Sequence, residues 1–551
     1  MPLSLTRERF IALARQAHES LAARRAGAHA AAPAPTPVVP LGLRLLGDQL
    51  TPVLAYRRLV VRDDRTAPSF LFESVENGER IGRYSILGAA PTLEVVAHAE
   101  RLTIRDRRAE SAHRVTHETC PDPLARLAQL TAHLAPVDLP ADVAARLPGS
   151  SAGGWVGYAA YDAARYTEPG KIPFSAAPRD DRGLPDLHFA FYPRVVIFDH
   201  VQTLVHVVEL VEVPVADEAG AAFDAAHSRL LALARDLQTH SKPLPSGALT
   251  AHDRPHPGLR SNMTRQQHEH IVARAKDYIR AGDIFQVVVG QRFELASPAD
   301  PFDVYRALRA VNPSPYMAYL QAEGCILVAS SPEILCRVRR DPSGALRVTN
   351  RPLAGTRRRG SSPDEDDALA RELLADQKER AEHIMLVDLG RNDVGRVARA
   401  GSVSLPTLMA VERYSHVMHI SSTVEGLLAP GATAWDALRA ALPVGTISGA
   451  PKIRAMQIID ELEPVRRGPY GGGFGHAALS GEMDIALALR TIVVPTALRK
   501  GDHWTYHLQA SGGIVHDSDP AAEFQETVNK AAALVRAVQV AEQAFCSTGD
   551  A

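Results

Sequence analysis

Residues 188–213 read HFAFYPRVVIFDHVQTLVHVVELVEV, which is three short apolar runs separated by turn signals. The runs are His188–Tyr192, Arg194–Phe198 and Leu204–Val213, and they are rich in Val, Ile, Phe and Tyr. These residue types are enriched in strands, and the polar residues and proline between the runs favour turns. The stretch therefore predicts three consecutive β-strands.

The same pattern continues on both sides of this stretch. Short apolar runs such as Leu93–Ala97 alternate with turn signals from residue 38 onward, and Asp217–Leu237 predicts an Ala-rich helix. Nearer the N-terminus, Leu5–Arg25 predicts an amphipathic helix, and residues 30–37 (AAAPAPTP) predict a stiff, extended linker. The N-terminal part of the chain is thus expected to be rich in β-structure.

Beyond residues 239–262, which hold many Pro, Ser, Gly and His, long helices alternate with strands. Helices are predicted over Arg265–Ala281, Pro363–Leu389, Thr433–Leu442, Pro451–Glu461 and Asp519–Phe545, and a strand over Phe285–Phe293. The predicted organisation is a helix and linker at 1–37, a β-rich domain at 38–238, a linker at 239–262 and a second domain at 263–545. Periodicity alone predicts a mixed chain, β-rich and then α/β.

Charge and cysteine content argue against several classes of protein. The net charge is −2, so no global basic field attracts nucleic acid or an anionic membrane. Cys120, Cys325, Cys336 and Cys546 show no C-x-x-C spacing, which argues against structural zinc and a disulfide scaffold. No apolar run approaches the ~18 residues of a membrane span. We expect a cytoplasmic protein without nucleic-acid or membrane partners.

Two pairs of glutamates stand three residues apart on predicted helices: Glu379 with Glu382, and Glu523 with Glu526. This spacing places both side chains of a pair on one helix face. If the two faces meet, four carboxylates would suit Mg²⁺, with coordination positions left for substrate oxygens. The alternative is an ordinary solvated face, since Lys or Arg stands within four residues of each pair. Spacing alone leaves both interpretations open.

Two glycine-rich segments and one histidine are further candidates. Pro469–Gly475 and Ala510–Ile514 present backbone N–H groups that can bind carboxylates or phosphates, and the alternative is a tight turn or bulge. Neither segment matches a dinucleotide-binding or Walker loop, so nucleotide binding is not supported. His419 stands in an apolar stretch. It is either a structural core residue or, if it lines a site, a general base.

Several of these segments belong to an ordered series of short motifs. The series is Asp48–Tyr56, Phe72–Ser74, Gly82–Ser85, Gly282–Gln286, Asn312–Met317, Ser331–Glu333, Arg351–Arg357, Glu382–Asp393, Val417–His419, Gly449–Lys452, Tyr470–Gly472 and Ile514–Glu526. Any one motif is weak, but the ordered set is specific. Over about residues 38–540 it resembles the chorismate-utilising enzymes, and among them the large subunits of anthranilate synthases.

The resemblance implies an α+β fold in which large antiparallel sheets are flanked by helices. Two interleaved subdomains would hold the active site between them. Glu382 and Glu526 would ligate Mg²⁺, which grips the ring carboxylate of chorismate, and Glu379 and Glu523 would support them. A Lewis acid is useful there because negative charge builds on that side of the ring.

The resemblance also implies which residues meet the substrate. Those implied to bind chorismate are Gly355, Thr356, Tyr470, Arg490, Ser511, Gly512 and Gly513. The family commonly has glycine where this chain has Ser511. Those implied at the reaction centre are Glu333, His419, Thr356 and Gln286. Glu333 would be the general acid for the departing C4 hydroxyl, and His419 the base that removes the C2 proton as pyruvate leaves.

Two positions discriminate among products. Aminodeoxychorismate synthases carry Lys where this chain has Ala354, and that lysine can act as a covalent nucleophile. Isochorismate and salicylate synthases carry Lys where this chain has Gln286, and use it to activate water. Both positions favour direct attack of ammonia at C2, and hence anthranilate. The alternatives are an aminodeoxychorismate synthase and a non-catalytic binding protein of the same fold.

The sequence also bears on where the ammonia comes from and on how the reaction is inhibited. None of the four cysteines stands in the Gly-x-Cys-x-Gly setting of a glutamine amidotransferase, so a separate amidotransferase subunit is expected. Glu73, Ser74, Pro315, Tyr316 and Met317 resemble the L-tryptophan feedback site of the family. The resemblance therefore implies the first step of tryptophan biosynthesis, with L-tryptophan as inhibitor.

Overall fold

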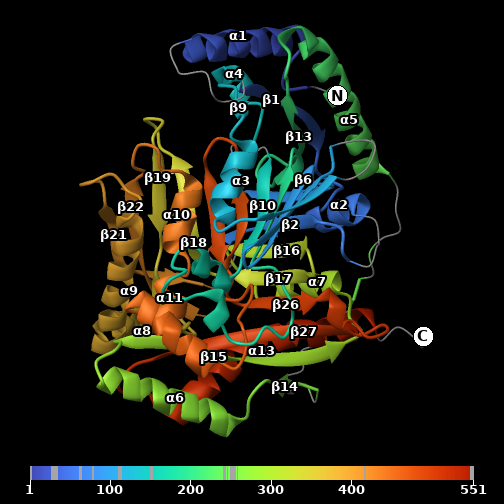
Figure 1. Cartoon of the computed structure of the whole chain (residues 1–551). Coiled ribbons are helices and arrows are strands. Elements are labelled where there is room, and N and C mark those ends of the chain that lie inside the picture. Colours follow the sequence, from blue (N-terminus) through green and yellow to red (C-terminus); the bar gives the residue numbers. More distant parts are fainter. Residues whose placement is uncertain are drawn as a thin grey trace.

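The computed structural model describes residues 3–26, 35–60, 65–76, 80–108, 114–148, 153–239, 244, 246–247, 256, 258–414 and 417–546. Two large sheets form the body of the molecule, and helices cover them, with α1 (Arg7–Ala26) at one end and α6 (Arg265–Arg280) at the other (Figure 1). The fold is mixed α+β, as the sequence predicts.

The first sheet follows the order β14 (Arg260–Ser261), β15 (Gln286–Ser297), β27 (Trp504–Ile514), β26 (Thr491–Pro495), β17 (Cys325–Ser331), β16 (Tyr316–Ala322), β2 (Ser69–Glu73), β5 (Tyr84–Ala89), β12 (Arg194–Asp199), β13 (Leu204–Glu212), β1 (Thr36–Leu46) and β9 (Leu134–Pro136); β23 (Gly449–Ala450) also pairs with β15. Within the described residues its paired strands are antiparallel, except that β1 and β9 are parallel.

The second sheet follows the order β20 (Leu353–Arg358), β22 (Val417–Leu427), β19 (Leu346–Asn350), β18 (Ile334–Arg340), β25 (Met483–Leu487), β24 (Gly473–Ala477), β10 (Gly154–Ala159), β11 (Leu187–Tyr192), β6 (Leu93–His98), β7 (Arg101–Asp106) and β8 (Arg114–Thr119); β21 (Ser404–Arg413) pairs with β22. A small ribbon joins β3 (Val75–Glu76) and β4 (Arg80–Ile81). Both large sheets take strands from both sides of the predicted 239–262 linker, so the two predicted domains interleave in space.

The remaining helices are α2 (Pro52–Leu59), α3 (Pro123–Thr131), α4 (Ala141–Ala144), α5 (Ala219–Gln238), α7 (Pro301–Val311), α8 (Pro363–Ala375), α9 (Gln377–Gly395), α10 (Ala434–Ala441), α11 (Gly445–Ser448), α12 (Lys452–Leu462) and α13 (Pro520–Phe545). Short 3₁₀ turns are η1 (Tyr161–Tyr166), η2 (Phe174–Ala176), η3 (Ala216–Glu218) and η4 (Thr496–Leu498). The structure confirms the helices predicted at the N-terminus, after residue 217, and at 265–281, 433–442, 451–461 and 519–545.

The predicted strands of residues 188–213 are β11, β12 and β13, and burial explains their continuous apolar character. On β12, Val196 and Phe198 pack in the core beneath the helices, whereas Val195 and Ile197 pack in the core between the two sheets. Successive strand residues face opposite sides of a sheet, so a strand covered on both sides needs apolar residues at every position. Each such side chain contributes roughly 1.5–3 kcal/mol by its burial.

Two sequence predictions are corrected by the structure. The single helix predicted over Pro363–Leu389 is two helices, α8 and α9, because Asp376 leaves the helical conformation and its side chain accepts from the backbone N–H groups of Lys378 and Glu379. The last two residues of the linker predicted at 30–37 belong instead to β1, which begins at Thr36 and pairs with β9 and β13. Of the predicted linkers, residues 30–34, 240–243, 245, 248–255 and 257 lie outside the described residues.

Aspartate caps place both glutamate pairs at the beginning of a helix. Asp376 caps α9, which carries one pair, and Asp519 caps α13, which carries the other. Carboxylates near a helix N-terminus are stabilised by the unpaired backbone N–H groups there.

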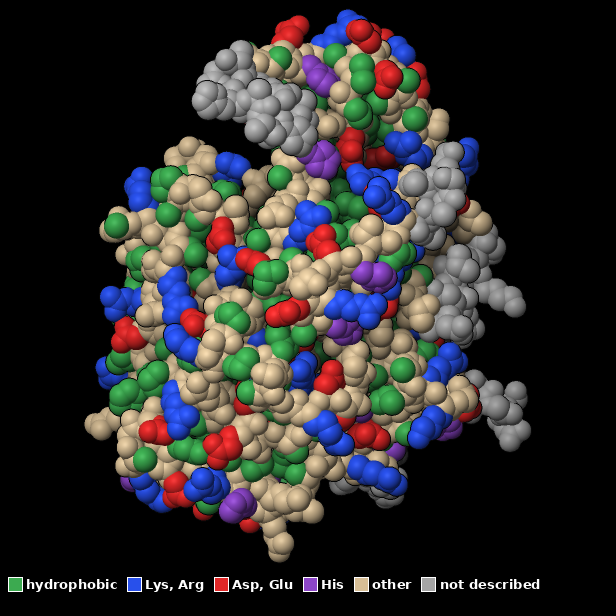
Figure 2. All heavy atoms as spheres, in the orientation of Figure 1, with side chains coloured by type: hydrophobic (Ala, Val, Ile, Leu, Met, Phe, Trp, Pro, Cys, Tyr) green, Lys and Arg blue, Asp and Glu red, His purple; other side chains and the backbone are tan. Residues whose placement is uncertain are grey.

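The surface carries charges of both signs. On the face shown in Figure 2, Lys and Arg side chains are interspersed with Asp and Glu, in keeping with the net charge of −2. Among the described residues, no helix has the length and apolar character needed to cross a membrane.

Candidate active site

His419 lies on β22 between two neighbouring strands. It is directly opposite Thr356 of β20 and Glu412 of β21, so the three side chains form one row on one face of the sheet. A β-bulge at Gly355, which has φ 65°, brings its carbonyl oxygen to 2.9 Å from His419 Nδ1. Thr356 Oγ1 lies 3.1 Å from the same nitrogen. Since a carbonyl only accepts, Nδ1 carries the proton and Nε2 keeps its lone pair.

The surroundings of His419 keep the ring neutral. Burial lowers the pKa of His419 to about 4, and the nearby cations Arg490 and Lys530 act in the same direction. The Gly355 carbonyl and the Glu412 carboxylate oppose this shift only in part. At neutral pH the imidazole is therefore an unprotonated base, as a proton-abstracting role requires.

Glu333 is a buried carboxyl between β17 and β18. Its side chain is only 4% exposed, and Oε1 accepts a hydrogen bond from Thr446 Oγ1 at 3.0 Å. Burial raises the pKa of Glu333 to about 8, and the hydrogen bond from Thr446 opposes this only weakly. The carboxyl is thus protonated at neutral pH and able to donate.

Arg490 is a partly buried cation. It has a left-handed backbone conformation, with φ 45°, which is unfavourable for a residue with a side chain. Within the described part of the chain its guanidinium makes no hydrogen bond or ion pair, and burial lowers the pKa of Arg490. An unpaired guanidinium in such a place is suited to a carboxylate, which it can bind through two parallel hydrogen bonds.

Tyr470 stands on a loop that buried hydrogen bonds and an ion pair hold in place. Its hydroxyl donates to Ser511 Oγ at 3.0 Å, and burial raises the pKa of Tyr470 to about 12. Three residues earlier, the buried Arg467 donates to two main-chain carbonyls and pairs with Glu463 at 2.6 Å. The loop therefore holds the tyrosine hydroxyl at a fixed position beside Ser511.

Gly512 and Gly513 on β27 allow neighbouring polar side chains to approach the backbone. A Cβ atom at Gly512 would lie 2.7 Å from Glu523 Oε2, and one at Gly513 would lie 2.6 Å from Gln286 Nε2. Glu523 Oε2 and Gln286 Oε1 are buried and find no hydrogen-bond partner among the described residues. Unsatisfied polar atoms beside open backbone are expected where a polar ligand binds.

The four predicted glutamates lie near one another. Burial raises the pKa of Glu382, and Glu379, Glu523 and Glu526 raise it further. Glu379 Oε2 lies 3.1 Å from where a Cβ on Gly355 would be, so the group borders the His419 row. The structure therefore brings together glutamates that stand more than 140 residues apart in the sequence.

The carboxylates also meet lysines. Glu526 lies 2.5 Å from Lys530 and Glu382 lies 4.0 Å from Lys378, the helix pairs that the alternative interpretation of the sequence required. In the part of the chain that the structure describes, no group of three or more His, Cys, Asp or Glu side chains is arranged to hold a metal. The donors themselves still suit Mg²⁺, because they are hard oxygens that repel one another and Glu523 Oε2 is unpaired.

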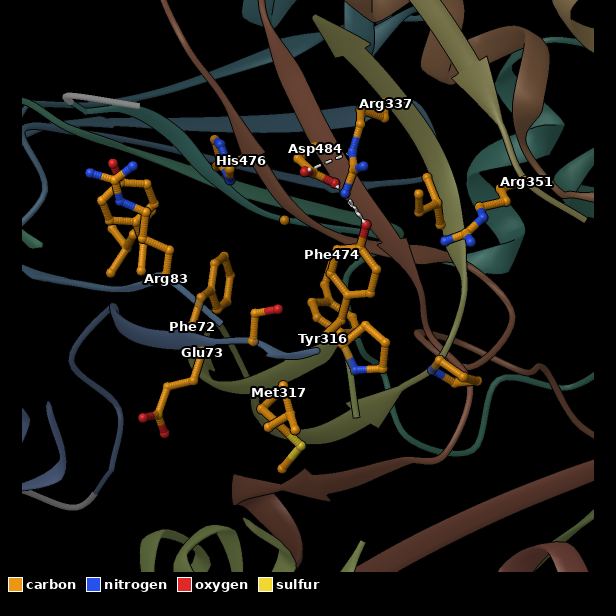
Figure 3. Close-up of a pocket in the computed structure, with 18 of the residues that line it drawn as sticks. Phe72, Glu73, Arg83, Tyr316, Met317, Arg337, Arg351, Phe474, His476 and Asp484 are labelled. Carbon is orange, nitrogen blue, oxygen red and sulfur yellow. Dashed lines mark hydrogen bonds and ion pairs between the residues drawn. The ribbon is translucent and has the colours of Figure 1, made fainter. Parts of the chain in front are cut away.

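A cavity of about 760 Å³ lies beside the row formed by Thr356, His419 and Glu412, because Glu412 lines it. All five residues that resemble a tryptophan site line it: Glu73, Ser74, Pro315, Tyr316 and Met317. The Glu73 carboxylate is turned away from the other labelled side chains in Figure 3. It accepts from the Tyr305 hydroxyl at 2.5 Å and pairs with Arg309 at 2.8 Å.

Aromatic and charged groups alternate around the cavity. Phe72 and Phe474 provide apolar walls, and Arg337 joins Asp484 to the Tyr316 hydroxyl (Figure 3). Arg83 also lines the cavity. Apolar walls with charges of both signs suit a zwitterion that carries an aromatic ring.

Sequence patterns missed three residues of this site. Tyr414 packs its ring against that of His419, with 5.5 Å between centroids, and its hydroxyl donates to Glu412 Oε2 at 3.0 Å. Thr446 is the partner of Glu333. The signal that could have found Glu412 is its place in an edge strand opposite His419, but that pairing is known only from the fold.

Comparison with known proteins agrees with this geometry. The chorismate binding enzyme family matches residues 68–536. The chain is 51% identical to the anthranilate synthase alpha subunit 1 (chloroplastic) of Oryza sativa subsp. indica, over 92% of this chain and 89% of that one. It is 44% identical to the anthranilate synthase component 1 of Pseudomonas putida, over 92% and 96%. The crystal structure of anthranilate synthase component I from Streptococcus pneumoniae TIGR4 superimposes with a TM-score of 0.68 at 34% identity, over 90% and 99%.

Proposed function

The chain belongs to the family of chorismate binding enzymes, and we propose that it is the large subunit of an anthranilate synthase, converting chorismate and ammonia to anthranilate and pyruvate. The observation that carries the proposal is the acid and base pair. Glu333 is a carboxyl kept protonated by burial, and His419 is an imidazole kept neutral with Nε2 free. Two groups whose pKa values are pushed apart in this way suit one donor and one acceptor of protons.

The two groups would act in succession. As ammonia adds at C2 of chorismate, Glu333 donates its proton to the C4 hydroxyl, which leaves as water. The ammonium group formed at C2 loses a proton to solvent. The ring then loses its C2 proton to His419 Nε2, the bond from C3 to the enolpyruvyl oxygen breaks, and the released enolpyruvate takes up a proton at its methylene carbon to become pyruvate. Loss of the C2 proton makes the ring aromatic, which drives the step. Thr356 and the Gly355 carbonyl hold the imidazole in the required tautomer.

The substrate carries two carboxylates, and the site offers different partners to each. Arg490 and Tyr470, with the backbone of Gly512 and Gly513, suit the enolpyruvyl carboxylate. Glu382 and Glu526 would hold Mg²⁺, with Glu379 and Glu523 in support. When bound, the metal would neutralise the ring carboxylate as a Lewis acid. The donor chemistry of the four glutamates supports this assignment.

Ala354 and Gln286 support anthranilate rather than aminodeoxychorismate or isochorismate. Neither side chain supplies the amine that a covalent intermediate or an activated water would need. We expect ammonia to come from a separate glutamine amidotransferase subunit. Of the four cysteines, Cys120, Cys325 and Cys336 are buried, and burial raises the pKa of each thiol, unlike a reactive nucleophile.

We also propose that L-tryptophan inhibits the enzyme by binding in the 760 Å³ cavity. Its apolar walls and paired charges support an aromatic amino acid. A cytoplasmic location remains a prediction, and the rice relative is named as chloroplastic.

One experiment tests the reaction. The purified chain is incubated with chorismate, Mg²⁺ and ammonium, and products are followed by fluorescence and mass. We expect anthranilate and pyruvate in equal amounts, and no product when glutamine replaces ammonium. A product that retains the enolpyruvyl group would mark an aminodeoxychorismate synthase, and no turnover would mark a binding protein. Glutamine-dependent activity of the chain alone would contradict the proposal that a separate subunit supplies the ammonia.

A further inference from the structure

Glu412 lies in a wall that two sites share. It is directly opposite His419 across β21 and β22, and it also lines the 760 Å³ cavity. The same wall contributes Arg351, Leu353 and Tyr414 to the cavity. A change on the cavity side of this wall therefore reaches the catalytic base through one layer of side chains.

The Glu412 carboxylate is held by three groups. Oε1 accepts from the Arg351 guanidinium and from the Ser421 hydroxyl, and Oε2 accepts from the Tyr414 hydroxyl at 3.0 Å. Each partner comes from a different place in the chain: Arg351 from the segment before β20, Ser421 from β22, and Tyr414 from the residue that follows β21. The carboxylate is thus fixed between the cavity and the catalytic row.

Tyr414 transmits that position to the base. Its ring meets the His419 ring edge to face, with 5.5 Å between centroids and 62° between planes. The other side of the imidazole is held by the Gly355 carbonyl. Removing the Tyr414 contact would leave His419 held on one side only.

Arg351 is the member of the set that a cavity ligand can reach. Its side chain is 38% exposed, and Figure 3 shows it across the cavity from Arg83. A ligand carboxylate near Arg351 would compete with Glu412 for the guanidinium. The two arrangements are Arg351 paired with Glu412 and Arg351 paired with the ligand. A ligand shifts the equilibrium between them only as far as its affinities for the two differ.

We propose that Glu412 is a positioning residue for His419, and that it makes the catalytic base responsive to a ligand in the cavity. The inference rests on the proposed function, and it adds the side chains through which cavity and base communicate. Arg351, Glu412 and Tyr414 form the connection, and loss of the Glu412 carboxylate breaks it.

The test compares Glu412→Gln and Tyr414→Phe with the wild type. Tyr414→Phe removes only the hydroxyl that donates to Glu412, so the ring keeps its volume but is no longer tied to the carboxylate that positions it against His419. Glu425→Gln is the matched control, because Glu425 is a glutamate of β22 that also pairs with an arginine, Arg347, at 3.7 Å, and it does not line the cavity. Turnover is measured with saturating ammonium and Mg²⁺, and L-tryptophan binding by calorimetry.

We expect both variants to lower kcat about tenfold, with the KM for chorismate within about twofold, because a displaced base slows chemistry rather than binding. L-Tryptophan should still bind but should inhibit the variants less than the control. The proposal is overturned if either variant matches Glu425→Gln in kcat and inhibition, or if KM rises as much as kcat falls. If the wild type itself forms no anthranilate, the proposed function fails first; if it does and the variants match it, only the positioning role fails.

Discussion

Replacing Glu333 by glutamine should slow turnover strongly and, at the same time, stabilise the folded protein at alkaline pH. Glutamine keeps the size of the side chain and can still accept from the Thr446 hydroxyl, which lies 3.0 Å from Glu333 Oε1. It has no proton to give to a leaving hydroxyl. Loss of a general acid typically lowers kcat by about 10²–10⁴-fold.

The effect on stability follows from burial. The pKa of Glu333 is about 8 in the folded protein against an ordinary value of 4.5. Below pH 4.5 the carboxyl is protonated in both states and has no pH-dependent effect. Between these values unfolding releases a proton, so the free energy of unfolding falls by about 1.4 kcal/mol per pH unit as pH rises. Across the whole window the wild type loses about 5 kcal/mol that the glutamine variant keeps.

Urea unfolding of wild type and Glu333→Gln from pH 5 to 9 measures this difference. The gap in unfolding free energy should widen up to about pH 8 and then stay constant. Glu19→Gln is the control, since Glu19 is exposed on α1. Parallel curves for wild type and Glu333→Gln would show that the carboxyl is not held protonated, and the acid role would then be wrong.

Three further outcomes follow from the site. Arg490→Lys loses the forked donor and should raise the KM for chorismate about tenfold, equivalent to about 1.4 kcal/mol; an unchanged KM would contradict its place at a carboxylate. Gly355→Ala should lower kcat and cost about 1–2 kcal/mol of stability, because the residue has φ 65° and an added Cβ would lie 3.1 Å from Glu379 Oε2. A wild-type melting temperature and kcat would contradict this. Chelation with EDTA should abolish turnover and added Mg²⁺ should restore it, and Glu526→Gln should raise the Mg²⁺ concentration required; full activity in EDTA would reject the metal.

Local sequence was enough for the strands of residues 188–213 and for most of the predicted helices, but not for their assembly. The apolar run Arg194–Phe198 predicts a strand, and its burial on two faces accounts for that run. Nothing in the run shows that β11 lies in one sheet and β12 in the other, although only Pro193 separates them. That crossing depends on pairing with β5, which lies more than 100 residues away. The break at Asp376 was missed because strong helix formers on both sides hide a capping residue.

The same limit separates the site residues that were predicted from those that were not. Glu333 and His419 stand in motifs that the resemblance identifies. Glu412 and Tyr414 stand outside those motifs, and they reach His419 only through the register of β21 on β22. Register between strands is set by long-range packing, so a sequence pattern carries no direct sign of it.

The electrostatics of the site support the proposed Mg²⁺. Burial removes the charge from both catalytic groups, since it keeps Glu333 protonated and His419 neutral. The remaining charges are then unequal: Arg490 can neutralise one carboxylate of chorismate, while Glu379, Glu523 and Glu526 lie close enough to Glu382 to raise its pKa. A second substrate carboxylate placed there would be repelled unless a cation lay between. Lys378 and Lys530 are partly exposed and already paired with Glu382 and Glu526, and this supports the divalent ion that we propose beside these glutamates.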